Sequence, residues 1–465
     1  MIQFTWKRRL AIILGLWGRS SAGRAPRSQC GGRGFDPLRL HQDLSNLLFK
    51  QAFSFSGVPG SAHGPTQSSQ RPAKSRVDAG FGTTLANWGT HPRDLGIRMT
   101  LIAAVGLDTY PVVFGDLLIS GPERPDSAPD ISLAGAVTSV FPAGSDWSIL
   151  GLNQKVVLLG DNCVIAWAGN VVFARTVITG LRALASQAPL SPPIIEKYLA
   201  KLDPTMKDQV SLVGWVRDGE VFHQFWYRAD IAESALFGRV SAGGSAATEF
   251  VMLASQISRG SWNAAGRALA ALERPISSML SATSLLLRAE LSSENNLLQY
   301  FGGGYEIATF IGDKFAKVGD IAFVFWMANV THGEVALSGL WPVLKQDYAD
   351  DFLLLHGLRV RPGRVSTDPP LIEEDRHVVA PFGSTVDAAR ANGISWPGME
   401  ATFTCHVVLV HSTKDITVFN RIDYSESRTP KSISFSLEDR HISFGVNRQF
   451  ADELTQSVRA GLAES

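Results

Sequence analysis

MTLIAAVGLDTYPVVFGDLLIS, residues 99–120, contains two short apolar runs, at 100–105 and at 112–119. Both runs have the length and composition of buried β-strands. The segment 108–111 between them, Asp-Thr-Tyr-Pro, supplies residues that favour a turn. The stretch therefore predicts a β-hairpin, around which we expect the rest of the chain to be organised.

The second apolar run carries a carboxylate. Alternation along a strand places Asp116 on the same face as Val112 and Phe114. An unpaired charge among hydrophobic side chains is costly, so a cation is expected within reach of Asp116. The candidate is Lys155, which opens the next predicted strand, 155–159.

These residues resemble the beta-type subunits of the proteasome and the related bacterial peptidase, which are N-terminal nucleophile hydrolases. Thr100 stands where that family has its N-terminal nucleophilic threonine, and Asp116 follows sixteen residues later, as the family's aspartate does. Lys155 matches the family's lysine through the local pattern of residues 153–169, NQKVVLLGDNCVIAWAG, which follows an insertion at 122–147. The resemblance extends over roughly residues 100–330.

The order of predicted elements agrees with the fold that the resemblance implies, an α+β, four-layer αββα sandwich of two antiparallel sheets. Strands, two helices, strands, two helices and strands follow one another, as in two sheets between helical layers. We expect one sheet from the strands at 100–105, 112–119, 155–159 and 163–168, packed against helices at 170–187 and 192–202. We also expect the strand at 302–310 to pair with one at 319–325.

The chain divides into three predicted parts. Residues 99–335 form the expected N-terminal-nucleophile-hydrolase-like core, and residues 336–465 form a C-terminal extension with strands and a closing helix. Residues 1–98 show no sustained period of 2 or 3.6, so no packed core is expected there.

Residues 1–98 also differ from the rest in charge. They contain 14 basic and 4 acidic residues, whereas residues 99–465 contain 29 basic and 39 acidic ones. Lys7–Arg9 and the apolar residues 10–17 fit the start of a signal peptide. The basic tract that follows favours instead a disordered, low-complexity segment or a start-site artefact. Because the tract lacks interleaved aromatic residues, nucleic-acid binding is expected only as weak, salt-sensitive attraction.

The chemistry implied by the resemblance begins with an N-terminal threonine. A free α-amine has a pKa of about 7.7–8.0, so it can accept the hydroxyl proton near neutral pH. Met99 directly precedes Thr100, and initiation there followed by methionine removal would expose the amine. Lys155 would then act as electrostatic activator, with Asp116 as its partner. The alternatives are that Thr100 simply suits a strand and that Asp116 and Lys155 form a structural ion pair.

Two glycine-rich turns, at 242–244 and 302–304, match turns of the family. The residues expected to bind the oxyanion or to support the nucleophile are Gly243, Gly244 and Ser245. The family has serines where this chain has Ala242 and Gly302, and an aspartate where Gln299 aligns. These departures leave a second hypothesis open, in which the chain is a catalytically inactive subunit of the same fold with a structural or binding role.

Other function classes lack their motifs in this sequence. The three cysteines, Cys30, Cys163 and Cys405, are too widely spaced for a metal motif or a disulfide framework, which favours a reducing compartment. There is no phosphate-binding loop, GxSxG or HExxH, and no apolar run approaches the length of a membrane span. We therefore expect a soluble, cytoplasmic protein without metal or cofactor. The resemblance implies a peptide or protein substrate and a homo-oligomer, which in the family is a ring.

Overall fold

The computed structural model describes residues 100–107, 110–122, 130–131, 135–136, 148–256, 273–292, 301–331, 334–361, 371–385, 393–411, 416–425, 433–438 and 441–464. The expected disordered segment 1–98 and nearly all of the insertion at 122–147 therefore lie outside the described residues. Within them the chain has a mixed α+β fold with several antiparallel sheets.

The expected hairpin lies at the centre of the first six-stranded sheet. β1 (Leu101–Leu107) pairs antiparallel with β2 (Tyr110–Asp116), with Val105 opposite Val112, which confirms the hairpin. The strand order is β11-β12-β1-β2-β13-β14. The other four strands are β11 (Asp230–Ser234), β12 (Gly238–Gly244), β13 (Tyr305–Ile311) and β14 (Lys314–Lys317).

A second, four-stranded sheet lies against the first, in the order β10-β9-β8-β7. Its strands are β7 (Val156–Leu158), β8 (Cys163–Gly169), β9 (Val210–Asp218) and β10 (Val221–Tyr227). The prediction that the strands at 100–105, 112–119, 155–159 and 163–168 form one sheet is therefore wrong. The two hairpins stack face to face and are not joined edge to edge, and apolar side chains such as Ile102, Ala104 and Val164 fill the space between the sheets.

The second predicted strand is also shorter than expected, because the backbone turns away at Leu117. The Leu117 N–H donates to the carbonyl oxygens of Gly302 and Gly304, both at 3.1 Å. The chain then continues as β3 (Leu118–Gly121), which pairs with β6 (Ser148–Leu152) in a separate two-stranded sheet. This departure leaves Asp116 at the very end of β2.

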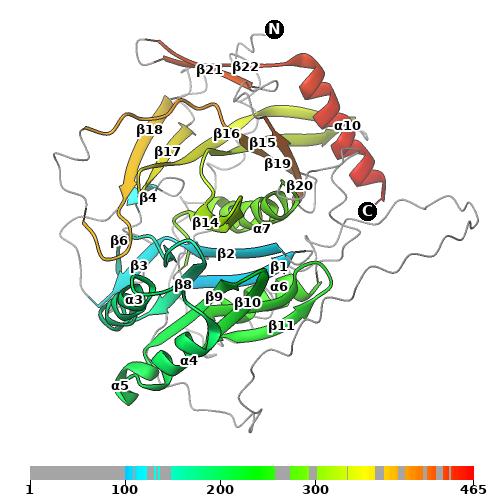
Figure 1. Cartoon of the computed structure of the whole chain (residues 1–465). Helices are drawn as coiled ribbons and strands as arrows, with labels where there is room; N and C mark the ends of the chain where they lie inside the picture. The colour runs from blue at the N-terminus through cyan, green and yellow to red at the C-terminus, as the bar shows by residue number, and fades with distance from the viewer. Residues whose placement is uncertain are drawn as a thin grey trace, which may run out of the picture.

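Helices cover the outer faces of both sheets (Figure 1). On the four-stranded sheet lie α3 (Val171–Ala185) and α4 (Pro192–Ala200), which confirms the helices expected at 170–187 and 192–202. The Asn170 side chain caps α3 by accepting from the N–H groups of Val172 and Phe173. The short helix α5 (Pro204–Lys207) follows α4. On the six-stranded sheet lie α6 (Ala247–Gln256) and α7 (Glu273–Ser292).

A third sheet, of six strands, packs on the far side of α7 (Figure 1). Its order is β18-β17-β16-β15-β19-β20, and its outer face is covered by α10 (Arg448–Glu464). The strands are β15 (Ile321–Thr331), β16 (Glu334–Ala349), β17 (Phe352–Arg361), β18 (Leu371–Val379), β19 (Phe403–His411) and β20 (Ile416–Tyr424). Small two-stranded ribbons are β4 (Asp130–Ile131) with β5 (Gly135–Ala136), and β21 (Ile433–Glu438) with β22 (His441–Val446).

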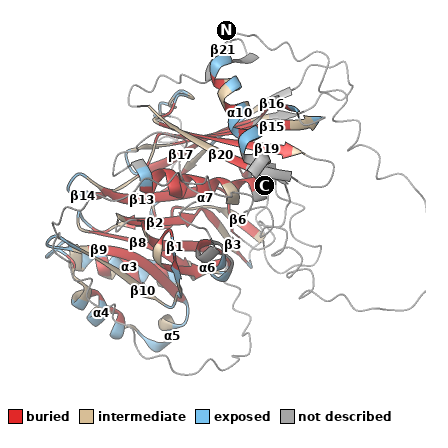
Figure 2. Cartoon of the chain, turned by 90° about the vertical axis from the view of Figure 1, so that its right-hand side faces the viewer, coloured by how far each residue is buried: buried red, intermediate tan, exposed pale blue. Residues whose placement is uncertain are grey.

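The third sheet changes the expected pairing of the strand at 319–325. That segment is β15, which pairs with β16 and β19, whereas β13 pairs with β14. The boundary expected at residue 335 falls inside β16, close to its start, and β16 pairs with β15 across that boundary. Figure 2 shows buried residues running through both large sheets and α7, so α7 is enclosed between the two sheets.

A buried ion pair ties together the beginning of the third sheet. The Lys345 ammonium of β16 contacts Asp320, which directly precedes β15, and also donates to the Glu400 carbonyl oxygen at 2.6 Å. The second Asp320 oxygen accepts from the backbone N–H and the hydroxyl of Thr402, at 3.0 and 2.6 Å. Asp320 therefore joins the starts of β15 and of the parallel strand β19 to the C-terminal part of the antiparallel strand β16.

Replacing Lys345 by alanine should destabilise the protein strongly. The change leaves the Asp320 carboxylate without its cation in a buried site, and breaking one side of such a pair typically costs about 3–5 kcal/mol. Urea unfolding of the variant measures this loss. Lys314→Ala, at an exposed lysine of β14, is the matched control and should change the unfolding free energy by less than about 0.5 kcal/mol. Equal effects of the two substitutions would contradict the assignment.

Candidate active site

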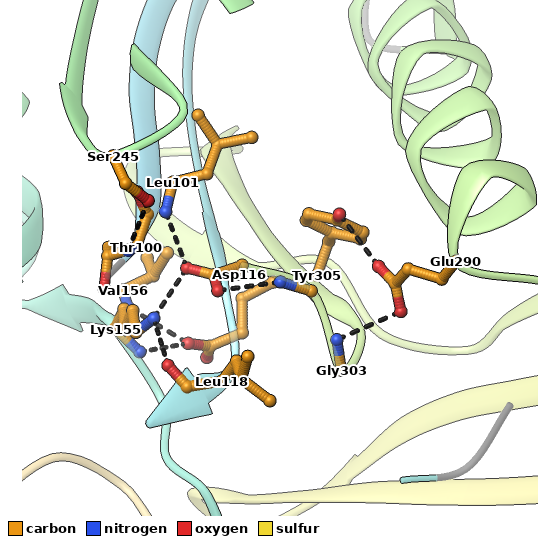
Figure 3. Close-up of polar contacts among 12 residues, drawn as sticks. Thr100, Leu101, Asp116, Leu118, Lys155, Val156, Ser245, Glu290, Gly303 and Tyr305 are labelled. Carbon is orange, nitrogen blue, oxygen red and sulfur yellow. Dashed lines mark hydrogen bonds and ion pairs between the residues drawn. The ribbon is translucent and has the colours of Figure 1, made fainter. Parts of the chain in front are cut away.

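Thr100, Asp116 and Lys155 come together from three separate elements (Figure 3). Thr100 directly precedes β1, Asp116 ends β2 and Lys155 directly precedes β7. The Lys155 Nζ lies 2.6 Å from Asp116 Oδ1 and 2.6 Å from the Leu118 carbonyl oxygen. Both charged side chains are fully buried. The predicted contact between the lysine and the aspartate is therefore confirmed.

Backbone donors complete the environment of the Asp116 carboxylate. The Leu101 N–H donates to Oδ1 at 2.9 Å and the Gly302 N–H donates to Oδ2 at 3.0 Å. Burial raises the pKa of Asp116, and the Lys155 charge and these N–H groups oppose that rise. Burial likewise lowers the pKa of Lys155, against the attraction of Asp116. The pair thus has the compensating contacts that two buried charges require.

The expected supporting turn lies beside Thr100. The Thr100 N–H donates to Ser245 Oγ at 3.3 Å, and the Ala246 N–H donates to the Thr100 carbonyl oxygen at 3.4 Å. Gly244 has a φ of +97°, and a Cβ there would lie 1.9 Å from the Thr100 carbonyl oxygen. Only glycine allows this approach.

The other residues of the turn differ in their surroundings. Gly243 pairs with Ile102 across β1 and β12, and a Cβ there would meet Ile102 and Ser211 at 3.1 Å. Ala242 is buried in the hydrophobic core on the helical side of the sheet. The turn therefore presents Ser245 to Thr100, whereas position 242 serves packing.

Two further buried carboxylates lie at the site and are not among the residues predicted from the sequence. Glu306 of β13 accepts from the backbone N–H groups of Lys155 and Val156, at 2.6 and 3.0 Å, and so fixes the backbone that carries the lysine. Its other oxygen accepts from Lys317 Nζ at 2.7 Å and from the Tyr348 hydroxyl at 3.2 Å. In the sequence, Glu306 can be recognised as a charged residue inside the apolar run 305–310.

The second carboxylate, Glu290, is on α7. It accepts from the Tyr305 hydroxyl at 2.9 Å and from the Gly303 N–H at 3.1 Å (Figure 3). Helical spacing from Thr283 and Leu287 places Glu290 on the buried face of α7. This spacing is the feature of the sequence from which its burial can be predicted. Burial raises its pKa to about 8. Gln299, which aligns with the family's aspartate, lies outside the described residues.

Comparison with known proteins leaves the family open. No protein-family model matches this chain. No curated protein matches it significantly.

The described residues also bear on other chemistries. They contain no cluster of three or more His, Cys, Asp or Glu side chains placed to hold a metal ion. Cys163 and Cys405 are buried free thiols, and burial raises the pKa of Cys405 to about 12, which disfavours a reactive thiolate there. Among the helices that the structure describes, none has the length and apolar character needed to cross a membrane.

A cleft of about 480 Å³ lies near the ion pair but does not contain it. Val156 of β7, Lys317 of β14 and Tyr348 of β16 are among its lining residues, together with the charged side chains Arg182 and Asp350. Lys317 and Tyr348 both contact Glu306, so the cleft borders the backbone support of Lys155.

Replacing Lys155 by alanine should cost about 3–5 kcal/mol of unfolding free energy, because Asp116 then stays buried without the cation that compensates its burial. Denaturant unfolding measures the change. Lys197→Ala, at an exposed lysine of α4, is the control and should have almost no effect. A loss of less than about 0.5 kcal/mol in Lys155→Ala would mean that the two residues do not depend on each other.

Glu290 should make the stability of the protein depend on pH. Its pKa rises from 4.5 to about 8 on folding, so its stabilising contribution is complete below pH 4.5 and is lost as the pH rises through 8. Each unit of pKa difference corresponds to about 1.4 kcal/mol. Urea unfolding between pH 5 and 9 should therefore show a decline in the wild type relative to Glu290→Gln. Parallel curves for the two proteins would contradict the burial of an ionisable Glu290.

Proposed function

We propose that this chain is a proteasome-like amide-bond hydrolase of the N-terminal nucleophile class, a threonine peptidase in which Thr100 becomes the first residue. The observation that carries the proposal is the buried Lys155–Asp116 pair beside Thr100, assembled from three elements. A stack of α3 and α4, two antiparallel sheets, and α6 and α7 supports the finer fold proposal, an αββα sandwich. The third sheet and α10 extend that stack.

In the proposed reaction the free α-amine of Thr100 accepts the proton of its own hydroxyl as Oγ1 attacks the substrate carbonyl carbon. The amine then returns the proton to the leaving nitrogen as the C–N bond breaks, and water hydrolyses the resulting ester. Ser245, whose Oγ lies 3.3 Å from the Thr100 nitrogen, orients the amine. Lys155 supplies the positive charge that stabilises the developing alkoxide, and Asp116 keeps that charge in place.

The oxyanion donor is proposed to be an N–H of the turn formed by Gly243, Gly244 and Ser245. Gly244 brings this turn against Thr100, closer than any residue with a Cβ would permit. Donors held by a rigid backbone stabilise a tetrahedral oxyanion without reorganising during the reaction.

A second candidate function is a catalytically inactive subunit of the same fold with a structural or binding role. Ala242 and Gly302 favour it, because neither carries the hydroxyl that the resembling family has at those positions. Ser245 argues for activity, since its hydroxyl contacts the Thr100 nitrogen from the same turn.

The proposal also includes the substrate, the oligomeric state and the location of the protein. A peptide or protein is the proposed substrate, and a homo-oligomer in the cytoplasm is the proposed form. These follow from the resemblance to the proteasome family.

Exposure of the Thr100 amine should switch the activity on. A chain that begins at Thr100 should cleave fluorogenic peptide amides, and the same chain with Thr100→Ala should show no turnover above the uncatalysed background, because it lacks the attacking hydroxyl. The full chain, in which residue 99 blocks the amine, should stay inactive until it is trimmed. Intact mass verifies each N-terminus, and turnover is measured in parallel. Turnover should rise through neutral pH as the amine loses its proton.

Three outcomes separate the hypotheses. Full activity in the untrimmed chain or in Thr100→Ala would rule out the mechanism. Correct trimming without activity on any peptide would favour the inactive subunit. Thr100→Ser is the conservative control and should retain measurable turnover, because serine keeps both the hydroxyl and the amine.

A further inference from the structure

The turn formed by Gly302, Gly303 and Gly304 is unusual in having three consecutive residues at positive φ, +127°, +75° and +108°. Side-chain-bearing residues rarely adopt these angles, and glycines lose much conformational freedom when they are fixed in one conformation. Such a turn needs restraints from its surroundings. Some come from the segment directly after β2: the N–H groups of Leu117 and Leu118 donate to the Gly302 carbonyl oxygen at 3.1 and 3.0 Å.

Two further restraints are the carboxylates of Asp116 on β2 and Glu290 on α7. The Gly302 N–H donates to Asp116 Oδ2 at 3.0 Å, and the next N–H, of Gly303, donates to Glu290 Oε2 at 3.1 Å. A Cβ on Gly302 would lie 2.6 Å from Glu290 Oε1. The Glu290 carboxyl group therefore fills the space that a side chain at position 302 would need.

We infer that Glu290 is a positioning residue of the proposed active site, which holds the Gly302–Gly304 turn in the conformation that donates to Asp116. Its influence on turnover rests on the proposed function, whereas its coupling to Asp116 does not. Glu290 does not touch the nucleophile; it acts through the turn, Asp116 and then Lys155 (Figure 3).

The charged and titratable groups around Glu290 come from few elements. Tyr305 of β13 contacts it directly, and the charge of Asp116 on β2 acts on it, with Lys155 beyond. On α7 itself, Arg288 interacts electrostatically with His411 of β19. The surroundings of Gly304 are apolar, since a Cβ there would meet Leu117 and Leu355.

Because Glu290 is buried close to Asp116, its effect on the site depends on pH. Burial first, and the Asp116 charge to a smaller extent, raise the pKa of Glu290 to about 8, so at neutral pH the carboxyl group is protonated. It then holds the turn without adding a negative charge near the ion pair. Above pH 8 the ionised Glu290 offsets part of the positive potential of Lys155 at Thr100, and turnover should fall.

Kinetics of the chain that begins at Thr100, which contains every residue that the structure describes, test the inference. The wild type should lose kcat above about pH 8, whereas Glu290→Gln, which keeps an acceptor for the Gly303 N–H but cannot ionise, should not. Glu290→Ala, which leaves that N–H unpaired, should lower kcat about tenfold or more with little change in KM, because it misplaces the site. Glu196→Gln, at an exposed carboxylate of α4, should match the wild type throughout.

A pH profile of Glu290→Gln that matches the wild type would overturn the inference, and so would an unchanged kcat in Glu290→Ala. If Glu290→Ala does not fold, the Glu290→Gln profile decides. If no variant cleaves the peptide, the proposed function fails. The coupling between Glu290 and Asp116 is then measured in the full chain by urea unfolding at a series of pH values. The Glu290 transition near pH 8 should then move to lower pH in Asp116→Asn, because the neighbouring charge that raises it is gone. An unmoved transition would overturn the coupling.

Discussion

The buried ion pair between Lys155 and Asp116 is the interaction on which the rest of the site depends. Both side chains have left water completely, which is costly unless each charge keeps close partners. Asp116 meets this requirement with the ammonium group and two backbone N–H groups, and Lys155 meets it with the carboxylate and the Leu118 carbonyl oxygen. These contacts hold three segments together at the ion pair: β1, the turn after α7, and the residues at which the chain leaves β2.

The chain contains a second buried lysine–aspartate pair, and the comparison shows what distinguishes the first. At Lys345 and Asp320 the threonine hydroxyl, of Thr402, donates to the carboxylate itself, so it is engaged in holding strands together. At Lys155 and Asp116 the carboxylate is bound by backbone groups, and Thr100 is held by its nitrogen through Ser245. The same pair of residue types therefore serves the assembly of the third sheet in one place and, we propose, the activation of a hydroxyl in the other.

Two more carboxylates stabilise this arrangement at a distance from the nucleophile. Glu306 holds the backbone on which Lys155 is carried, and Glu290 holds the turn that donates to Asp116. The backbone around the pair is thus fixed by side chains of β13, which neighbours β2 in the sheet, and of α7, which packs on that sheet. Buried groups of this kind fix the geometry of a site before substrate binds. Electrostatic stabilisation of a transition state requires such a preorganised site.

The sequence by itself determined the local elements and the need for the ion pair. Strand alternation and helical spacing are short-range signals, so the hairpin, α3 and α4 could be predicted, and a charge inside an apolar strand required a partner wherever it came from. The tertiary structure decided how the strands are shared among the three large sheets, because apolar strands such as β7 and β15 can pair with many partners. It also decided the roles of Glu290 and Glu306, which act on residues 13 and 151 positions away. No local pattern specifies such contacts, because they depend on how α7 and β13 pack.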